Sequence, residues 1–181
     1  MNVAILIDEM NAMHQLQMLG IHGLNTWKSF FNTIKRELTN DFNNEISVDY
    51  HFYGCLPPEH YDRIRYHDRK RFFTRLQHDG IHVHQGLCLV DQGNLREKGI
   101  DLMIGLDLYE FSLNHYDLLF LFSGDADLIP AIERAKKHSK VVTILCKHMI
   151  SRHVRNAADG VLYLEKLLEK DQNNLIKGRV S

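Results

Sequence analysis

Residues 118–127 read LLFLFSGDAD, an unbroken aliphatic and aromatic run that is followed at once by serine, glycine and two aspartates. A continuous apolar run of this length is typical of a strand that is buried on both faces, as in a parallel sheet. Residues 3–7 (VAILI) have the same pattern and are also followed by an acid, Asp8. Residues 141–146 (VVTILC) form a third run of this kind. We therefore expect a sheet whose central strands are parallel.

Helical patterns separate these runs. The apolar side chains of one amphipathic helix recur at helical spacing at Trp27, Phe30, Phe31, Ile34 and Leu38. Further helices are expected over residues 98–113, 129–138 and 151–158, in the polar stretch 59–79, and as a short helix or loop near 11–20. Short strands are expected at 46–53, 81–84 and 161–164, with a break at 54–58 and a loop from 85 through 94. This alternation predicts an α/β fold, a three-layer α/β/α sandwich with a mainly parallel central sheet.

Length and composition limit the class of protein. With 181 residues the chain suits one domain, which we expect at 1–168 with a polar C-terminal tail at 169–181. The formal net charge of −1 argues against nucleic-acid binding over the whole surface, so such binding needs a local basic patch. Three cysteines without a Cys-x-x-Cys pair favour a reducing, cytoplasmic setting. No stretch approaches the roughly 20 apolar residues that span a bilayer, so we expect no membrane partner.

Acids follow two of the buried strands, at the place where function is expected. In open α/β sheets, ligands bind beyond the carboxyl ends of the strands, where the strand order reverses. If the strands at 3–7 and 118–122 are neighbours, Asp8, Asp125 and Asp127 meet at one edge and repel one another unless a cation or a proton compensates. Carboxylate oxygens without Cys or His ligands suit Mg²⁺ or Mn²⁺, which polarise phosphoryl oxygens and activate water. The alternative that these aspartates only cap helices and end strands stays open.

Three motifs in this order carry a family resemblance: LIDEMN (6–11), KGIDLMIGLDLYE (98–110) and LFSGDADLIPAI (121–132). Together they resemble the NYN domain group of PIN-like nucleases, in its LabA-like branch, whose members show D-x-x-N, K-G-x-D and S-G-D-x-D at similar spacing. A late segment at 151–159 also fits the group. The resemblance covers about residues 2–168, and it implies a PIN-like fold and a metal-dependent endoribonuclease that hydrolyses RNA.

The resemblance also implies which residues form the site. The catalytic acids, which would also hold Mg²⁺ or Mn²⁺, are Asp8, Asp101, Asp125 and Asp127. Asn11 and Ser123 match polar positions beside these acids, and we expect both to contact substrate. One departure is Glu9, because the family often has glycine after the first aspartate. A bulky acid at that position could add a ligand or crowd the site.

Two acids of the helix expected at 98–113, and a pair of histidines, need separate physical arguments. Asp101 lies among apolar residues of its helix, a setting in which an acid needs a partner or a metal. Asp107 is six residues further on, about 120° around the helix, so the two acids do not share a face. Asp107 is expected in the site's surroundings, beside a basic group, or in solvent. His82 and His84 would share one face of a strand, where exposed or hydrogen-bonded histidines are more common than a metal site.

Two basic segments are candidates for contact with nucleic acid. Residues 63–75 hold six Arg and Lys residues with interleaved aromatics, which suits RNA binding and equally suits a solvated helix. The second segment follows the strand at 141–146 and so lies near the acidic edge. We therefore expect substrate contacts from Lys147, Ser151, Arg152 and Arg155.

The rival functions differ in what they require of the acids. A phosphohydrolase of the haloacid dehalogenase type needs Asp-x-Asp after the first strand, where this chain has Asp8-Glu9-Met10. A response-regulator receiver fits the positions of the acids less well, although Lys147 resembles its late lysine. A non-catalytic RNA-binding or scaffold module with a PIN-like fold is the main alternative. The expected partner is RNA, and homodimerisation is left open.

Overall fold

The computed structural model describes residues 1–41, 45–114, 116–147 and 152–170. In chain order the elements are β1 (Asn2–Asp8), α1 (Glu9–Met18), α2 (Trp27–Asp41), β2 (Ser47–Cys55), α3 (Arg63–His78), β3 (His82–Asp91), β4 (Asn94–Lys98), α4 (Ile100–Leu113), β5 (Leu118–Phe122), the 3₁₀ turn η1 (Ala126–Leu128), α5 (Ile129–Ala135), β6 (Lys140–Leu145), α6 (Arg152–Ala157), β7 (Gly160–Tyr163) and α7 (Leu164–Lys170). The expected α/β fold with a mainly parallel sheet is confirmed.

The described strands form one sheet of seven, in the order β4-β3-β2-β1-β5-β6-β7. β4 is antiparallel to β3, and the other neighbouring pairs are parallel. β1 lies between β2 and β5, so the strand order runs outward from β1 in both directions. The carboxyl ends of β1 and β5 therefore meet where the order reverses, which is the place that open α/β sheets use for ligands. The condition that the strands at 3–7 and 118–122 are neighbours is therefore met.

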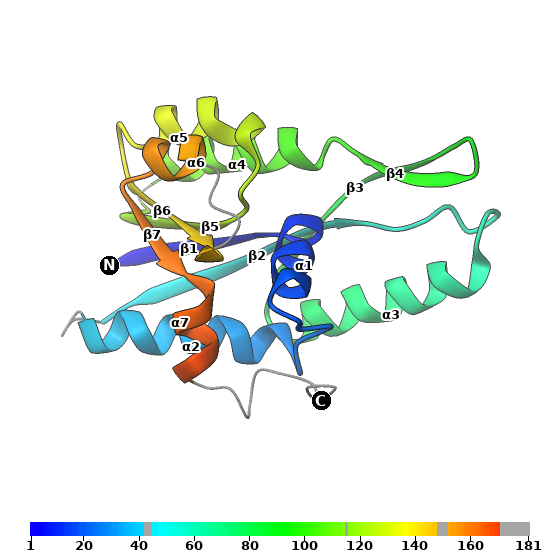
Figure 1. Ribbon diagram of the computed structural model, residues 1–181, viewed down its shortest axis with the longest axis horizontal. Coiled ribbons are helices and arrows are strands. Elements are labelled where there is room, and N and C mark those ends of the chain that lie inside the picture. Colours follow the sequence, from blue (N-terminus) through cyan, green and yellow to red (C-terminus); the bar gives the residue numbers. More distant parts are fainter. Residues whose placement is uncertain (42–44, 115, 148–151, 171–181) are drawn as a thin grey trace.

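Helices cover both faces of the sheet. Figure 1 shows α4, α5 and α6 on one face and α2, α3 and α7 on the other. β1 supplies both cores, with Val3, Ile5 and Ile7 facing α2 and with Ala4 and Leu6 facing α4 and α5. Complete burial of an Ile or Leu side chain contributes about 1.5–3 kcal/mol, which is why an unbroken apolar run makes a central strand.

Two stretches near the site differ from the sequence prediction. β2 continues through Gly54 to Cys55, where a break was expected. The expected loop after the strand at 81–84 is a hairpin instead, made of a long β3 and of β4. Its two-residue turn has positive φ at Gln92 (49°) and Gly93 (79°), the backbone that closes tight hairpins. A Gln at the first position hid this turn, because Asn or Asp is the usual signal there.

The helix ends also differ in detail. α5 ends at Ala135, earlier than expected, and η1 precedes it. α7 begins at Leu164, the expected end of a strand, and extends to Lys170 because Leu164, Leu167 and Leu168 bury against α2 and the sheet. Among the described helices, none combines the length and apolar character that crossing a membrane requires.

Candidate active site

Asp8 ends β1 and at the same time caps α1. Its Oδ1 accepts a hydrogen bond from the backbone N–H of Asn11 at 3.2 Å, and its Oδ2 accepts one from Ser123 Oγ at 2.8 Å. The side chain is 5% exposed. N-capping fixes one oxygen and the serine fixes the other, so the carboxylate is held in one orientation at the strand end. Asp8 therefore caps a helix and ends a strand, as the structural alternative expected from the sequence requires.

Burial raises the pKa of Asp8 to about 6. The hydrogen bonds from Asn11 and Ser123 act in the opposite direction, and the charges of Asp101 and Glu97 raise the pKa further. In the described part of the chain no Lys or Arg forms an ion pair with Asp8, Asp101 or Asp125. Among the described residues, these three carboxylates therefore have no ion-pair partner.

Asp8, Asp101 and Asp125 line one cavity of about 390 Å³. Asn11 and Glu97 also face it. Asp101 is exposed in the first turn of α4, where the helix dipole favours an acid. Its pKa is raised by burial and by the charges of Asp125 and Asp127. Apolar residues do flank Asp101, with Ile100 and Ile104 in the core and Leu102 67% exposed, but the acid itself lies on the exposed side of the helix.

Asp127 lies on the far side of Asp101 from this cavity. It is exposed, in the turn η1, and its backbone N–H donates to Asp125 Oδ1 at 2.9 Å. Its side chain lines a neighbouring hollow between α4 and α5, together with Asp101 and Arg134. Three of the four expected acids therefore share a cavity. The fourth, Asp127, lines the neighbouring hollow with Asp101, and its negative charge raises the pKa of Asp101.

Asn11 and Ser123 hold the site together. Asn11 Oδ1 accepts hydrogen bonds from the backbone N–H of Gly124 at 2.9 Å and from Gln15 Nε2 at 2.8 Å. Gln15 Oε1 in turn accepts one from the backbone N–H of Cys146 at 2.7 Å. Ser123 is fully buried, and its Oγ also accepts from the N–H of Asp125 at 3.2 Å. Helix α1 is thus fastened to the ends of β5 and β6, which fixes the acids relative to one another.

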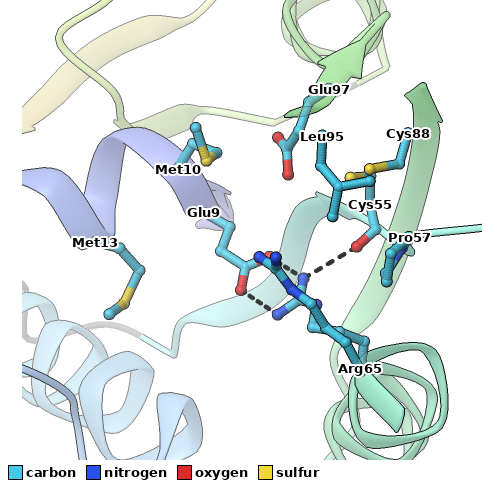
Figure 2. A pocket seen from close by; sticks show the side chains of 10 residues that line it. Glu9, Met10, Met13, Cys55, Pro57, Arg65, Cys88, Leu95 and Glu97 are labelled. Carbon is cyan, nitrogen blue, oxygen red and sulfur yellow. Dashed lines mark hydrogen bonds and ion pairs between the residues drawn. The ribbon is translucent and has the colours of Figure 1, made fainter. Parts of the chain in front are cut away.

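Glu9 is paired and turned away from the three aspartates. Arg69 on α3 donates to both of its carboxylate oxygens, and a third bond runs from Arg69 to the carbonyl of Cys55 at 3.3 Å (dashed lines in Figure 2). Phe73 packs beneath the guanidinium, 4.6 Å from it to the ring centroid. A side chain on Gly54 would place its Cβ 2.3 Å from Glu9 Oε2, so the glycine in β2 makes room for this pair.

Glu97 is an acid of this edge that the sequence prediction missed. It lies on β4 opposite Cys88 of β3, just after the stretch that was expected to be a loop and in residues to which no element was assigned. Burial raises its pKa, and so do the charges of Glu9 and Asp101, while a hydrogen bond with Cys55 and the charge of Arg69 lower it. Gly93 was a turn signal, but the flanking residues LCLVD (87–91) and NLREK (94–98) do not alternate between apolar and polar, so the usual hairpin pattern was absent.

Asp107 lies outside the acidic cavity and has its own partners. It accepts a hydrogen bond from Tyr53 Oη at 2.8 Å and lies 3.4 Å from His84 Nδ1. His84 Nε2 is 3.0 Å from His51 Nδ1, and the His51 ring stacks on His82. The shared face expected for His82 and His84 is therefore part of a hydrogen-bonded histidine cluster under α4. Burial lowers the pKa of His51 to about 3.

The basic residues divide between two places. On α3, Arg69 faces inward to Glu9, while Arg63, Arg65, Lys70 and Arg71 are exposed. Lys147 is exposed after β6, with its Nζ 5.9 Å above the Tyr163 ring. Arg152 and Arg155 are exposed on α6, which contacts η1 and so lies near Asp127. Ser151, the other residue expected to contact substrate, lies outside the described residues.

The chemistry of the donors fits a hard divalent cation. Asp8, Asp101 and Asp125 offer carboxylate oxygens, which Mg²⁺ and Mn²⁺ prefer as ligands. Arg96 and Lys98 also line the cavity, and Arg96 forms an ion pair with Asp91. Within the described ranges, however, no group of three or more His, Cys, Asp or Glu side chains converges closely enough to hold an ion as they stand. Since Asp101 and Asp125 are not buried, side-chain rotation is the change that binding would require.

The NYN domain model matches residues 2–165. The chain belongs to the NYN domain family. It is 27% identical over 176 residues to the low amplitude and bright protein LabA of Synechococcus elongatus, covering 91% of this chain and 84% of LabA. A crystal structure of a protein of unknown function from Vibrio parahaemolyticus superposes with a TM-score of 0.68 at 19% identity, covering 92% of this chain and 94% of that one. The family membership confirms the resemblance seen in the motifs and supports a PIN-like nuclease fold.

Proposed function

We propose that this NYN domain is a metal-dependent endoribonuclease that uses Mg²⁺ or Mn²⁺. The observation that carries the proposal is the cavity at the β1–β5 switch point, where Asp8, Asp101 and Asp125 gather. Arg96 and Lys98 also line this cavity, but neither forms an ion pair with these acids among the described residues. Burial raises the pKa of Asp8 to about 6, and carboxylates whose pKa is raised in this way are enriched at functional sites. Strained electrostatics of this kind are common at catalytic sites.

The chain's own residues would share the work as follows. Ser123 and the N–H of Asn11 hold the two oxygens of Asp8 in place, so that this carboxylate presents a fixed geometry. Asp101 and Asp125 approach from α4 and from the β5 loop, and Asp127 adds negative charge beside Asp101. A bound Mg²⁺ or Mn²⁺ would polarise a phosphoryl oxygen and lower the pKa of an attacking water. Lys147, Arg152 and Arg155 supply positive charge on the side of η1 for the RNA backbone.

The test is cleavage of a mixed RNA pool with Mn²⁺, comparing wild type with Asp8→Asn, Asp101→Asn and Asp125→Asn. The matched control is Glu110→Gln, an exposed acid further along α4 that does not line the cavity. We expect each site variant to lower the cleavage rate by at least about a hundredfold and the control to remain near wild type. Equal cleavage by all variants would identify a contaminating nuclease and refute the proposal.

Metal binding is measured separately by thermal unfolding in EDTA and in Mn²⁺. An ion at 100 times its dissociation constant stabilises the folded state by about 2.7 kcal/mol, so wild type should melt several degrees higher with Mn²⁺ and Asp8→Asn should not. RNA binding without cleavage and without a metal-dependent shift would favour the non-catalytic RNA-binding module.

A further inference from the structure

A second pocket opens beside the acidic cavity, at the carboxyl ends of β2 and β3. It lies between α1, α3 and the β3–β4 hairpin and encloses about 180 Å³. Figure 2 shows Met10 and Met13 on one side, Leu95, Cys55 and Cys88 on the other, and the Glu97 carboxylate pointing between them. An apolar cavity of about 150 Å³ accepts benzene, so this pocket has room for one planar heterocycle and not for a whole nucleotide.

The pocket is continuous with the acidic cavity. Met10, Leu95 and Glu97 line both. A chain whose phosphodiester lies against Asp8 and Asp101 therefore has a neighbouring position for one of its bases. Arg65 is exposed at the mouth of the pocket, where it can contact the backbone of the same strand.

The walls suit the faces of a base. The thioethers of Met10 and Met13 are polarisable and pack favourably against aromatic rings, and Leu95 and Pro57 complete an apolar surface. Such walls hold any base by its π-faces and do not distinguish one base from another. Selection has to come from the polar groups.

The polar groups are acceptors. Both oxygens of Glu9 already receive Arg69, which fixes that carboxylate in place. Within the described part of the chain Glu97 has no ion pair with a Lys or Arg, and its partner is the Cys55 thiol. A carboxylate accepts two parallel hydrogen bonds from adjacent N–H donors. Guanine offers such a pair on its Watson–Crick edge, adenine and cytosine offer one amino group, and uracil places carbonyl oxygens on both sides of its single N–H.

We propose that this pocket binds one unpaired base of the RNA strand next to the cleaved phosphodiester, and that Glu97 makes guanine the preferred base. The inference rests on RNA being the substrate class of the proposed function. The β3–β4 hairpin, which carries none of the four aspartates, would then select where the RNA strand is cut.

The test follows the methyl signals of the methionines by NMR during titration with 5′-GMP and 5′-UMP, which carry the same phosphate and differ in the base. We expect the methyl signals of Met10 and Met13 to shift, while the signal of Met18, which lies on the same helix but outside the pocket, does not change. GMP should bind at least about tenfold more tightly than UMP. Glu97→Gln should reduce this preference to about twofold or less, and Glu133→Gln, an exposed acid on α5, should leave it unchanged.

The outcomes separate this inference from the proposed function. Shifts at Met10 and Met13 with a guanine preference that depends on Glu97 support the pocket, even if the protein fails to cleave RNA. Equal binding of GMP and UMP, or a preference that survives in Glu97→Gln, overturns the inference, even if RNA is cleaved. As a second variant, Met13→Phe fills the pocket without removing an acid and should abolish the Met10 shift with either nucleotide. A Met10 shift that persists in Met13→Phe places the base elsewhere and also overturns it.

Discussion

Asp8 is buried, ionisable and the N-cap of α1, and these properties have opposite effects on stability. Its folded pKa of about 6 lies above the ordinary value of 3.8 for an aspartate, so the folded chain holds a proton that the unfolded chain has released between those pH values. Stability from this group is therefore present below about pH 4 and is lost as pH rises through about 6. At neutral pH the ionised carboxylate is a cost to the fold.

Asp8→Asn should consequently stabilise the protein at pH 7 by up to about 3 kcal/mol, while it removes the activity proposed above. Asparagine retains an N-capping oxygen, and its amide N–H can donate to Ser123 Oγ. Urea unfolding in EDTA checks this at pH 7 and at about pH 3.5, where the gain should vanish. A variant that is no more stable than wild type at pH 7 would contradict the assignment of an unfavourable buried charge.

The histidine cluster joins β2, β3 and α4, and its stability should depend on pH in the opposite direction. His51 is 6% exposed, and among the described residues its Nε2 has no hydrogen-bond partner. Its folded pKa of about 3 lies below the ordinary value of 6.5 for a histidine, so the unfolded chain binds the proton first as pH falls. Stability should thus decline as pH drops from about 6.5 towards 3.

We expect His51→Phe to reduce this decline by several kcal/mol between about pH 6.5 and 4, relative to wild type. The exposed His22→Phe serves as the control, because an exposed ring can accept its proton in water. Chemical unfolding at a series of pH values measures the slopes. Parallel slopes for wild type and His51→Phe would show that His51 is not held neutral by burial.

Among the elements, those with one strong periodicity were predicted correctly. β1 and β5 are unbroken apolar runs because both faces of a central parallel strand are buried, and α2 has an apolar stripe because one face packs on the sheet. The β3–β4 hairpin was not predicted. Its strands are largely exposed, so they lack a clear pattern of apolar and polar residues, and Gln92 is an unusual residue for its turn. Glu97 was missed together with the hairpin that carries it.

The acids themselves were predictable to different degrees. Asp8 and Asp125 follow buried strands, and strand order at a switch point follows from the α/β class, so their proximity could be inferred. Asp101 was expected from the family motif, whereas its exposure was not, because Ile100 and Ile104 face the core while Leu102 and Leu106 face solvent beside it. The pairing of Glu9 with Arg69 joins residues 60 positions apart, which no local pattern reveals.

For the whole molecule, a net charge of −1 means that RNA must be attracted locally. We expect Arg152→Gln with Arg155→Gln to weaken RNA binding and to lower the slope of log affinity against log salt by about 1.5–2. Lys137→Gln with Lys140→Gln removes the same charge at the opposite edge of the sheet, near the start of β6, and should leave the slope unchanged. Fluorescence anisotropy at several salt concentrations measures both. Equal slopes for the two double variants would place the RNA away from α6.

The position of β1 between β2 and β5 also has a kinetic consequence. β2 begins at Ser47, 45 residues after the start of β1 at Asn2. β5 begins only at Leu118, beyond the hairpin and α4. During synthesis, β1 can pair with β2 early, while its other edge must wait for a segment that emerges much later. Asp8 and Asp125 can therefore come together only after β5 and the residues that follow it have emerged, and a shorter nascent chain has an open strand edge but no assembled acidic centre.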